Sequence, residues 1–180
     1  MADEMMSRRP IILVGLPGSG KSTIGKAIAA RLGLKFIDSD AEIERETGMT
    51  IVRYFEVHGE KVFRPLEAEV ISRLLETRDC VIALGGGAFL NRLTRSAVKS
   101  MGTSIWLDAP LDLIEERLKH SADRPLLNAG DRLQALQQLS KAREPSYREA
   151  DIRIESVDQQ RAVDEILVAL RPWRRETASK

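Results

Sequence analysis

A glycine-rich loop with a lysine and a serine at fixed spacing is the part of this sequence that most clearly points to chemistry. Residues Gly15–Ser22 read Gly-Leu-Pro-Gly-Ser-Gly-Lys-Ser and match the pattern G-x-x-x-x-G-K-[ST]. An apolar run at 11–14 precedes the loop, and a segment at 23–30 with helical composition follows it. A strand, a loop and a helix in this order are the context in which the pattern binds phosphates. The sequence therefore predicts a site for a nucleoside triphosphate.

The glycines, the lysine and the last serine of the loop have tasks that follow from their chemistry. Gly15, Gly18 and Gly20 permit backbone conformations in which successive N–H groups point at phosphate oxygens. The start of the following helix adds the positive end of its dipole. We expect Lys21 to reach the outer phosphates and the Ser22 hydroxyl to bind Mg²⁺.

A pair of carboxylates follows the apolar run at 35–38. Asp38 and Asp40 are spaced i, i+2, so both side chains project to one side if the chain stays extended. Phosphoryl transfer needs one carboxylate for Mg²⁺ and another to orient the attacking hydroxyl, and these two aspartates can divide the tasks. In the alternative interpretation, Ser39 or Asp40 only caps a helix that begins at Ala41.

A further carboxylate competes with Asp38 for the metal. Asp108 ends the apolar run Ile105-Trp-Leu-Asp108, which has the form of a Walker B strand. The run at 80–84 ends instead in Gly85–Gly87, where many nucleotide-binding proteins carry that aspartate. Spacing alone does not separate Asp38 from Asp108.

Glycines and arginines elsewhere are candidates to surround an acceptor. The triplet Gly85–Gly87 lets a bare backbone approach a ligand closely. Arg64, Arg124 and Arg143 are candidates for anion binding, although isolated arginines are usually solvated surface residues. Because Pro65 lacks an N–H, a helix starting near Arg64 is favoured over one running through from an earlier residue.

These residues must be positioned by alternating strands and helices. Apolar runs predict strands at 11–14, 35–38, 80–84, 103–108 and 151–155. Helices are expected at about 20–32, 41–47, 50–57, 60–76, 91–99, 111–119, 131–142 and 159–171, with Gly33 and Gly48 as C-terminal caps. The alternation predicts a parallel sheet with helices on both faces. Ligands bind beyond the carboxyl ends of such strands, so the block at 41–76 is a candidate substrate cap and 120–130 a candidate lid.

Composition narrows the class of protein. The 180 residues suit one domain, and 28 Lys and Arg against 27 Asp and Glu leave no basic field for a nucleic acid. Cys80 is the only cysteine, no segment resembles a signal peptide, and no apolar run is long enough for a bilayer, so we expect a cytoplasmic protein without a membrane partner. N-K-x-D and D-x-x-G are both absent, which argues against a GTP-dependent switch.

Taken in order, the motifs resemble those of the shikimate kinase family. The resemblance spans about 10–171 and rests on the loop, Asp38-Ser-Asp40, Phe63-Arg-x-x-Glu67, Gly85–Gly87, Arg124-Pro-Leu and Arg143-x-x-x-Tyr147. It implies a P-loop NTPase fold of the nucleoside-monophosphate-kinase type, with a five-stranded parallel sheet in the order 2-3-1-4-5 flanked by helices. Residues 1–180 would form a single domain whose cap covers about 38–76 and whose lid covers about 119–131.

The same resemblance implies an activity. The family phosphorylates the 3-hydroxyl of shikimate with ATP and Mg²⁺, on the way to chorismate and the aromatic amino acids, and is usually monomeric. Another small-metabolite kinase of this fold, such as gluconate kinase, is the alternative. The pair Arg64 and Arg143, together with the glycine triplet, favours shikimate.

The resemblance also implies residue roles. Asp40, Lys21 and Arg124 would be catalytic, with Asp40 orienting the reacting hydroxyl. Ser22 and Asp38 would bind the metal, so the resemblance favours Asp38 over Asp108 as the metal carboxylate. Shikimate would contact Asp40, Arg64, Gly86, Gly87 and Arg143. ATP would contact Gly15, Pro17, Gly18, Ser19, Gly20, Lys21, Ser22, Thr23, Arg117 and Arg124.

Overall fold

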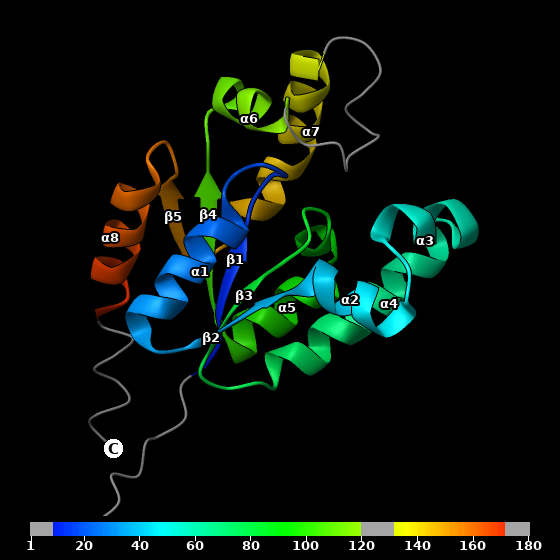
Figure 1. Cartoon of the computed structure of the whole chain (residues 1–180), viewed down its shortest axis with the longest axis horizontal. Helices are drawn as coiled ribbons and strands as arrows, with labels where there is room; N and C mark the ends of the chain where they lie inside the picture. Colours follow the sequence, from blue (N-terminus) through cyan, green and yellow to red (C-terminus); the bar gives the residue numbers. More distant parts are fainter. Residues whose placement is uncertain (1–8, 120–131, 172–180) are drawn as a thin grey trace, which may run out of the picture.

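A five-stranded parallel sheet forms the centre of the molecule (Figure 1). The computed structural model describes residues 9–119 and 132–171. The strand order is β2-β3-β1-β4-β5, as predicted, and every neighbouring pair is parallel. The strands are β1 (Ile11–Val14), β2 (Lys35–Asp38), β3 (Cys80–Ala83), β4 (Thr103–Asp108) and β5 (Ile152–Glu155).

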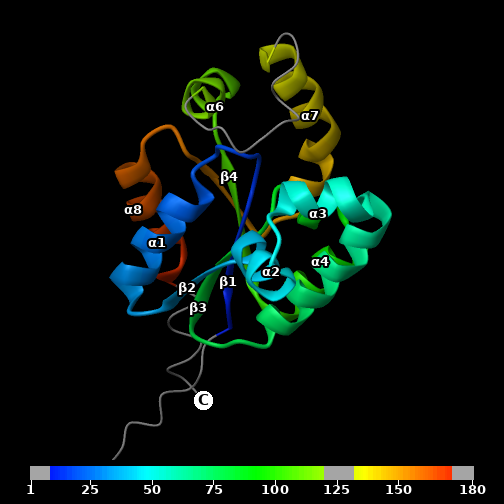
Figure 2. The same ribbon diagram turned by 45° about the vertical axis from the view of Figure 1, so that its right-hand side comes forward.

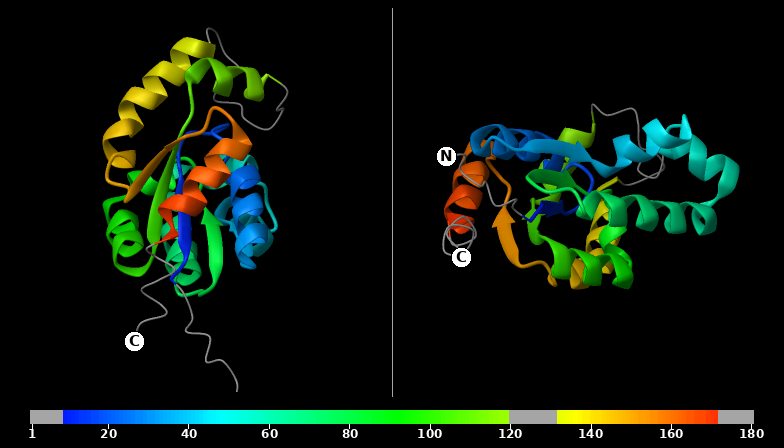
Figure 3. Two further views of the ribbon diagram at one scale, coloured as in Figure 1. Left: turned by 90° about the vertical axis from the view of Figure 1, so that its left-hand side faces the viewer. Right: turned by 90° about the horizontal axis from the view of Figure 1, so that it is seen from below.

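Alternate residues of the central strand divide the core into two layers. Ile11 and Leu13 face α1 (Lys21–Leu32) and α8 (Gln159–Ala169), which lie side by side on one face of the sheet (Figure 2). Ile12 and Val14 face the other layer, which includes α4 (Glu60–Leu75) and α5 (Arg92–Met101). Figure 3 shows the same layering from two further sides. All four β1 side chains are at most 1% exposed, because a central parallel strand is covered on both faces.

The remaining elements connect these layers. Gly33 and Gly48 take left-handed conformations at the ends of α1 and α2, as predicted for C-terminal caps. The connecting elements are α2 (Ser39–Thr47), α3 (Ile51–His58), η1 (Ala88–Leu90), α6 (Leu111–Leu118) and α7 (Arg132–Tyr147). Among residues 9–119 and 132–171, the structure contains no candidate membrane-spanning helix.

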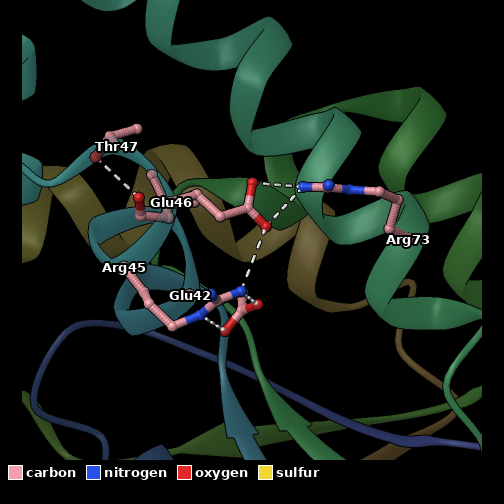
Figure 4. Close-up of polar contacts among 6 residues, drawn as sticks. Glu42, Arg45, Glu46, Thr47 and Arg73 are labelled. Atoms are coloured by element: carbon pink, nitrogen blue, oxygen red, sulfur yellow. Dashed lines mark hydrogen bonds and ion pairs between the residues drawn. The ribbon is translucent and has the colours of Figure 1, made fainter.

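Helices α2, α3 and α4 follow β2 and precede β3 in the sequence. They form a block on the opposite side of the molecule from α1 and α8 (Figure 1). Within it, Arg73 of α4 donates two hydrogen bonds to the Glu46 carboxylate of α2, at 2.8 and 2.6 Å (Figure 4). Glu42 and Arg45 form a further ion pair beside them, at 2.6 Å. Such exposed pairs contribute about 1 kcal/mol or less each, and only the pair of Arg73 with Glu46 joins α2 to α4.

The helix predicted over about 60–76 is confirmed, but the later start near Arg64 that Pro65 favoured is wrong. Helix α4 begins at Glu60 and continues through Pro65. Tertiary contacts override the local preference: Phe63 is only 2% exposed, and Arg64 contacts carboxylates in both neighbouring turns. Helix α7 likewise passes through Pro145 to Tyr147 and is longer than the predicted 131–142.

Candidate active site

The phosphate loop lies at the carboxyl edge of the sheet, between β1 and α1. Gly15 has φ 146°, and a Cβ there would lie 2.6 Å from the Leu107 carbonyl oxygen, so only glycine lets the loop pass so close to β4. The Lys21 ammonium donates to the carbonyls of Gly15 and Leu16, each at 2.9 Å. The lysine charge is therefore held directly at the loop where the motif predicts phosphates.

Ser19 has a structural place within this loop. Its N–H donates to the Leu16 carbonyl at 3.1 Å and closes a turn. Its hydroxyl is buried and has no hydrogen-bond partner in the described part of the chain. The Ser19 carbonyl accepts a 2.9 Å hydrogen bond from the fully buried Ser156 hydroxyl, which fixes the loop to the segment after β5.

Asp38 is brought to the loop and also caps a helix. The Ser22 hydroxyl donates to Asp38 Oδ2 at 2.8 Å, and Asp38 Oδ1 accepts from the Asp40 N–H at 3.1 Å. Asp38, rather than Ser39 or Asp40, is thus the N-cap, and α2 begins at Ser39 instead of the expected Ala41.

Asp108, the alternative metal carboxylate, is paired with an arginine. Asp108 Oδ2 accepts from two nitrogens of Arg153, at 2.6 and 3.0 Å, at the edge of the sheet formed by β4 and β5. The geometry therefore places Asp38, and not Asp108, next to the serine of the loop.

The donors around Ser22 fit Mg²⁺. A hydroxyl and a carboxylate supply the hard oxygen ligands that this ion prefers. Residues 9–119 and 132–171 contain no cluster of three or more His, Cys, Asp or Glu side chains that would form a complete protein cage. A site with only a few protein oxygens beside bound phosphates is typical of Mg²⁺, because this ion keeps several waters and takes further ligands from phosphates.

Asp40 lies against the bare backbone at the end of β3. A Cβ on Gly85 would collide with Asp40 Oδ1 and would lie 3.3 Å from Glu67 Oε1. The Gly85 N–H donates to the buried Ser39 hydroxyl at 2.9 Å, which fixes this approach. The first glycine of the triplet thus makes room for the carboxylate of the candidate catalytic residue.

Arg64 occupies the space beside the last glycine of the triplet. A Cβ on Gly87 would lie 2.7 Å from Arg64 Nη1. The guanidinium donates to Glu60 and to Glu67, with closest distances of 2.8 Å to each. Glu67 is 4% exposed, and burial raises the pKa of its carboxyl, with the negative charge of Asp40 adding to the rise and Arg64 opposing it.

Arg143 reaches the middle glycine from α7. Its Nη1 donates to the Gly86 carbonyl at 2.8 Å, and the Tyr147 hydroxyl donates to the same oxygen at 2.6 Å. A Cβ on Gly86 would lie 3.0 Å from Arg143 Nη1 and 3.1 Å from Pro17 Cδ of the phosphate loop. The triplet therefore lies between the loop and α7.

Arg117 contacts the middle of the phosphate loop, at Gly18. Its Nη1 donates to the Gly18 carbonyl at 3.2 Å, and its Nη2 donates to the carbonyls of Ser156 and Val157 at 3.4 Å. A planar guanidinium at this position offers a stacking face for a nucleotide base.

A cleft of about 420 Å³ joins these groups. It brings the loop, both aspartates of the pair and Arg117 together, and it is lined by Gly18, Gly20, Lys21, Ser22, Thr23, Ile24, Asp38, Asp40, Ala83, Leu84, Gly85, Gly86, Arg117 and Gln159. Arg64, Gly87 and Arg143 adjoin it through the glycine triplet. The predicted lid and its Arg124 lie outside the described residues, apart from Lys119.

Sequence reasoning gave no role to several residues that hold the site in place. Glu67 and Tyr147 were visible only as members of motifs, at i+3 from Arg64 and i+4 from Arg143, which are the spacings that place helical side chains on one face. Ser156 and Gln159 carried no local signal, because only the fold brings the segment after β5 to the phosphate loop.

Comparison with known proteins agrees with this geometry. Residues 17–171 match the model of a family described as shikimate kinase. A shikimate kinase of Rhodopseudomonas palustris is 48% identical over 167 residues, which cover 92% of this chain and 82% of the relative. One from Paramagnetospirillum magneticum is 47% identical over 168 residues, covering 88% of this chain and 86% of the relative.

Solved structures give the same result. The shikimate kinase of Acinetobacter baumannii in complex with shikimate is 38% identical, covers 91% of this chain and 93% of its own, and has a TM-score of 0.86. A gluconokinase from Sinorhizobium meliloti covers 90% of this chain and 91% of its own, but at 19% identity and a TM-score of 0.55 it shares the fold alone. The chain belongs to the shikimate kinase family.

Proposed function

We propose that this chain transfers the γ-phosphoryl group of ATP to the 3-hydroxyl of shikimate and forms shikimate 3-phosphate. The observation that carries the proposal is the convergence at one sheet edge of a phosphate loop, the Ser22–Asp38 pair, Asp40 and two arginines around a glycine triplet. In this family the reaction belongs to the pathway to chorismate and the aromatic amino acids.

The donor half of the site is the loop and its flanks. Backbone N–H groups after Gly15, the Lys21 ammonium and the start of α1 offer positive charge to the phosphates of ATP. Pro17, Ser19 and Thr23 complete this loop, with Ser19 acting through its turn. Arg117 lies between Gly18 of the loop and the segment after β5, where the adenine base would stack on its guanidinium.

The metal half is the pair Ser22 and Asp38. We assign Mg²⁺ to these oxygens, with Ser22 as a direct ligand and Asp38 in contact with the ion or its water shell. When bound, the ion would supply positive charge that neutralises the phosphates. Asp38 keeps its place without the ion because it also caps α2.

The acceptor half faces the loop from the block α2–α4 and from α7. Asp40 would accept the proton of the 3-hydroxyl or hold that hydroxyl for in-line attack. Arg64 and Arg143 would bind the shikimate carboxylate, which suits the planar fork of a guanidinium. The backbones of Gly86 and Gly87 would line the ring, and the 38–76 region would act as the substrate cap of a single-domain enzyme.

Sequence identity also favours shikimate over gluconate as the acceptor. Relatives named shikimate kinase are 42–48% identical over most of the chain, whereas the gluconokinase shares the fold at 19% identity. We propose that the enzyme acts in the cytoplasm, where ATP is available, and as a monomer, because one chain supplies every residue assigned to both substrates.

An acceptor panel tests this function. ADP release from ATP and Mg²⁺ is measured with shikimate, gluconate and nucleoside monophosphates in parallel. Stimulation by shikimate alone is expected. Stimulation by another acceptor, with none by shikimate, would overturn the proposal.

A further inference from the structure

The carbonyl oxygen of Gly86 receives two donors from one helix. Arg143 Nη1 lies 2.8 Å from it and the Tyr147 hydroxyl 2.6 Å, and the two residues are four apart on α7, hence on the same helix face. A carbonyl oxygen has two lone pairs, so it can accept both bonds at once.

The two donors differ in their freedom to move. Tyr147 is 2% exposed and its ring packs against Trp106 with 6.0 Å between ring centroids. Burial raises the pKa of its phenol, against the opposing charge of Arg143, so the hydroxyl stays a proton donor. Arg143 is only half-buried, at the end of a long flexible side chain.

We propose that Tyr147 is a positioning residue that releases Arg143 for the substrate carboxylate. The inference rests on the proposed function, and it takes the Arg143 guanidinium to turn from Gly86 so that its planar fork faces the shikimate carboxylate. When it turns, the Tyr147 hydroxyl remains on the Gly86 oxygen, and no carbonyl loses its last protein donor. Tyr147 also keeps the Gly86 backbone beside Pro17 while the arginine moves.

Removal of the phenol oxygen would make this exchange unfavourable. In a Tyr147→Phe variant, Arg143 is the remaining donor to Gly86 among the residues that the structure describes. Turning the arginine toward the substrate then leaves the carbonyl unpaired as substrate excludes water. We expect the KM for shikimate to rise by about three- to tenfold, the size of one net hydrogen bond. Phenylalanine keeps the ring against Trp106, so the fold should persist.

The experiment compares Tyr147→Phe, Arg143→Gln and the double variant with wild type. KM for shikimate, KM for ATP, kcat and thermal midpoint are measured, and binding is measured for a shikimate analogue with a hydroxymethyl group in place of the carboxylate. Arg148→Gln is the control, because Arg148 directly follows α7 and pairs with Glu144 on the exposed surface, outside the assigned site.

A specific pattern is expected. Tyr147→Phe raises the KM for shikimate and leaves the KM for ATP, kcat and analogue binding close to wild type. The same change adds little in the Arg143→Gln background, because no arginine remains to be released. Arg148→Gln behaves as wild type.

Two kinds of result overturn the inference. If Arg143→Gln raises the KM for shikimate while Tyr147→Phe does not, the positioning role fails and the proposed function stands. Equal losses for shikimate, ATP and the analogue in Tyr147→Phe would make Tyr147 a general structural residue. If Arg143→Gln leaves shikimate binding unchanged, the carboxylate assignment fails, and the role of Tyr147 fails with it.

Discussion

The Ser22 hydroxyl donates a 2.8 Å hydrogen bond to the Asp38 carboxylate, which joins the start of α1 to the end of β2. These residues are 16 apart in sequence and meet because β2 and the phosphate loop both end at the carboxyl edge of the sheet. The bond places two oxygens of the kind that suits a cation beside the loop at which we propose that the phosphates bind.

Replacing Asp38 by Asn tests the metal assignment. Asn preserves the helix cap but offers a neutral oxygen, so the Mg²⁺ concentration for half-maximal activity should rise and kcat should fall, by about 10- to 100-fold. A Mg²⁺ titration of activity measures both effects. Asp108→Asn, which removes only the negative charge that pairs with Arg153, is the control and should leave the Mg²⁺ requirement unchanged. The reverse pattern would return the metal to Asp108.

Asp40→Asn should act on turnover. The amide has nearly the same shape beside Gly85 but accepts no proton at neutral pH, so kcat should fall by about 10²- to 10⁴-fold. Steady-state kinetics should show smaller changes in both KM values. A kcat close to that of wild type would exclude Asp40 as the residue that acts on the hydroxyl.

Arg64→Lys should act on shikimate binding. Lysine retains a charge for Glu67 but loses the planar fork, so the KM for shikimate should rise about tenfold or more, with the KM for ATP unchanged. Arg73→Lys is the matched control, because Arg73 lies on the same helix and pairs with Glu46 away from the cleft. Equal effects of the two variants would assign Arg64 to the stability of α4 alone.

The raised pKa of the Glu67 carboxyl predicts how the stability of the protein depends on pH. Burial raises the pKa of its carboxyl in the folded protein above the ordinary value of 4.5, so the folded state holds this proton more tightly than the unfolded state. Its stabilising contribution is therefore complete below pH 4.5 and is lost as pH rises through the higher folded pKa.

Urea unfolding of wild type and Glu67→Gln across that pH range measures the effect. The stability of wild type relative to the variant should fall as pH rises from below 4.5. A relative stability that instead rose with pH would mean that the charge of Arg64 outweighs burial at this carboxyl.

Much of the fold could be predicted because its signals are local. Four buried side chains in β1 and the glycine caps at Gly33 and Gly48 are encoded in short stretches of sequence. Alternating strands and helices then give the parallel sheet. The helix expected at 60–76 matches α4, whereas the later start argued from Pro65 was wrong. Proline preference is local, but the burial of Phe63 and the carboxylate partners of Arg64 are tertiary.

In the candidate site too, residues with local sequence signals could be predicted, and residues that depend on tertiary contacts could not. The loop, with Lys21 and Ser22, is one continuous motif and was recognised directly. The choice between Asp38 and Asp108 needed the hydrogen bond from Ser22 and the pairing of Asp108 with Arg153, neither of which spacing reveals. The supports from Tyr147 and Ser156 join segments 61 and 137 residues apart, so only the assembled fold shows them.

Phosphorus–proton correlation NMR of the reaction product tests the central claim most directly. The enzyme is supplied with ATP, Mg²⁺ and shikimate, and the carbon bearing the new phosphate is identified by coupling between its proton and phosphorus. Transfer to the hydroxyl held at Asp40 predicts coupling to the proton on carbon 3 of the ring. Phosphate on another ring hydroxyl, or release of inorganic phosphate with no phosphorylated ring, would contradict the account.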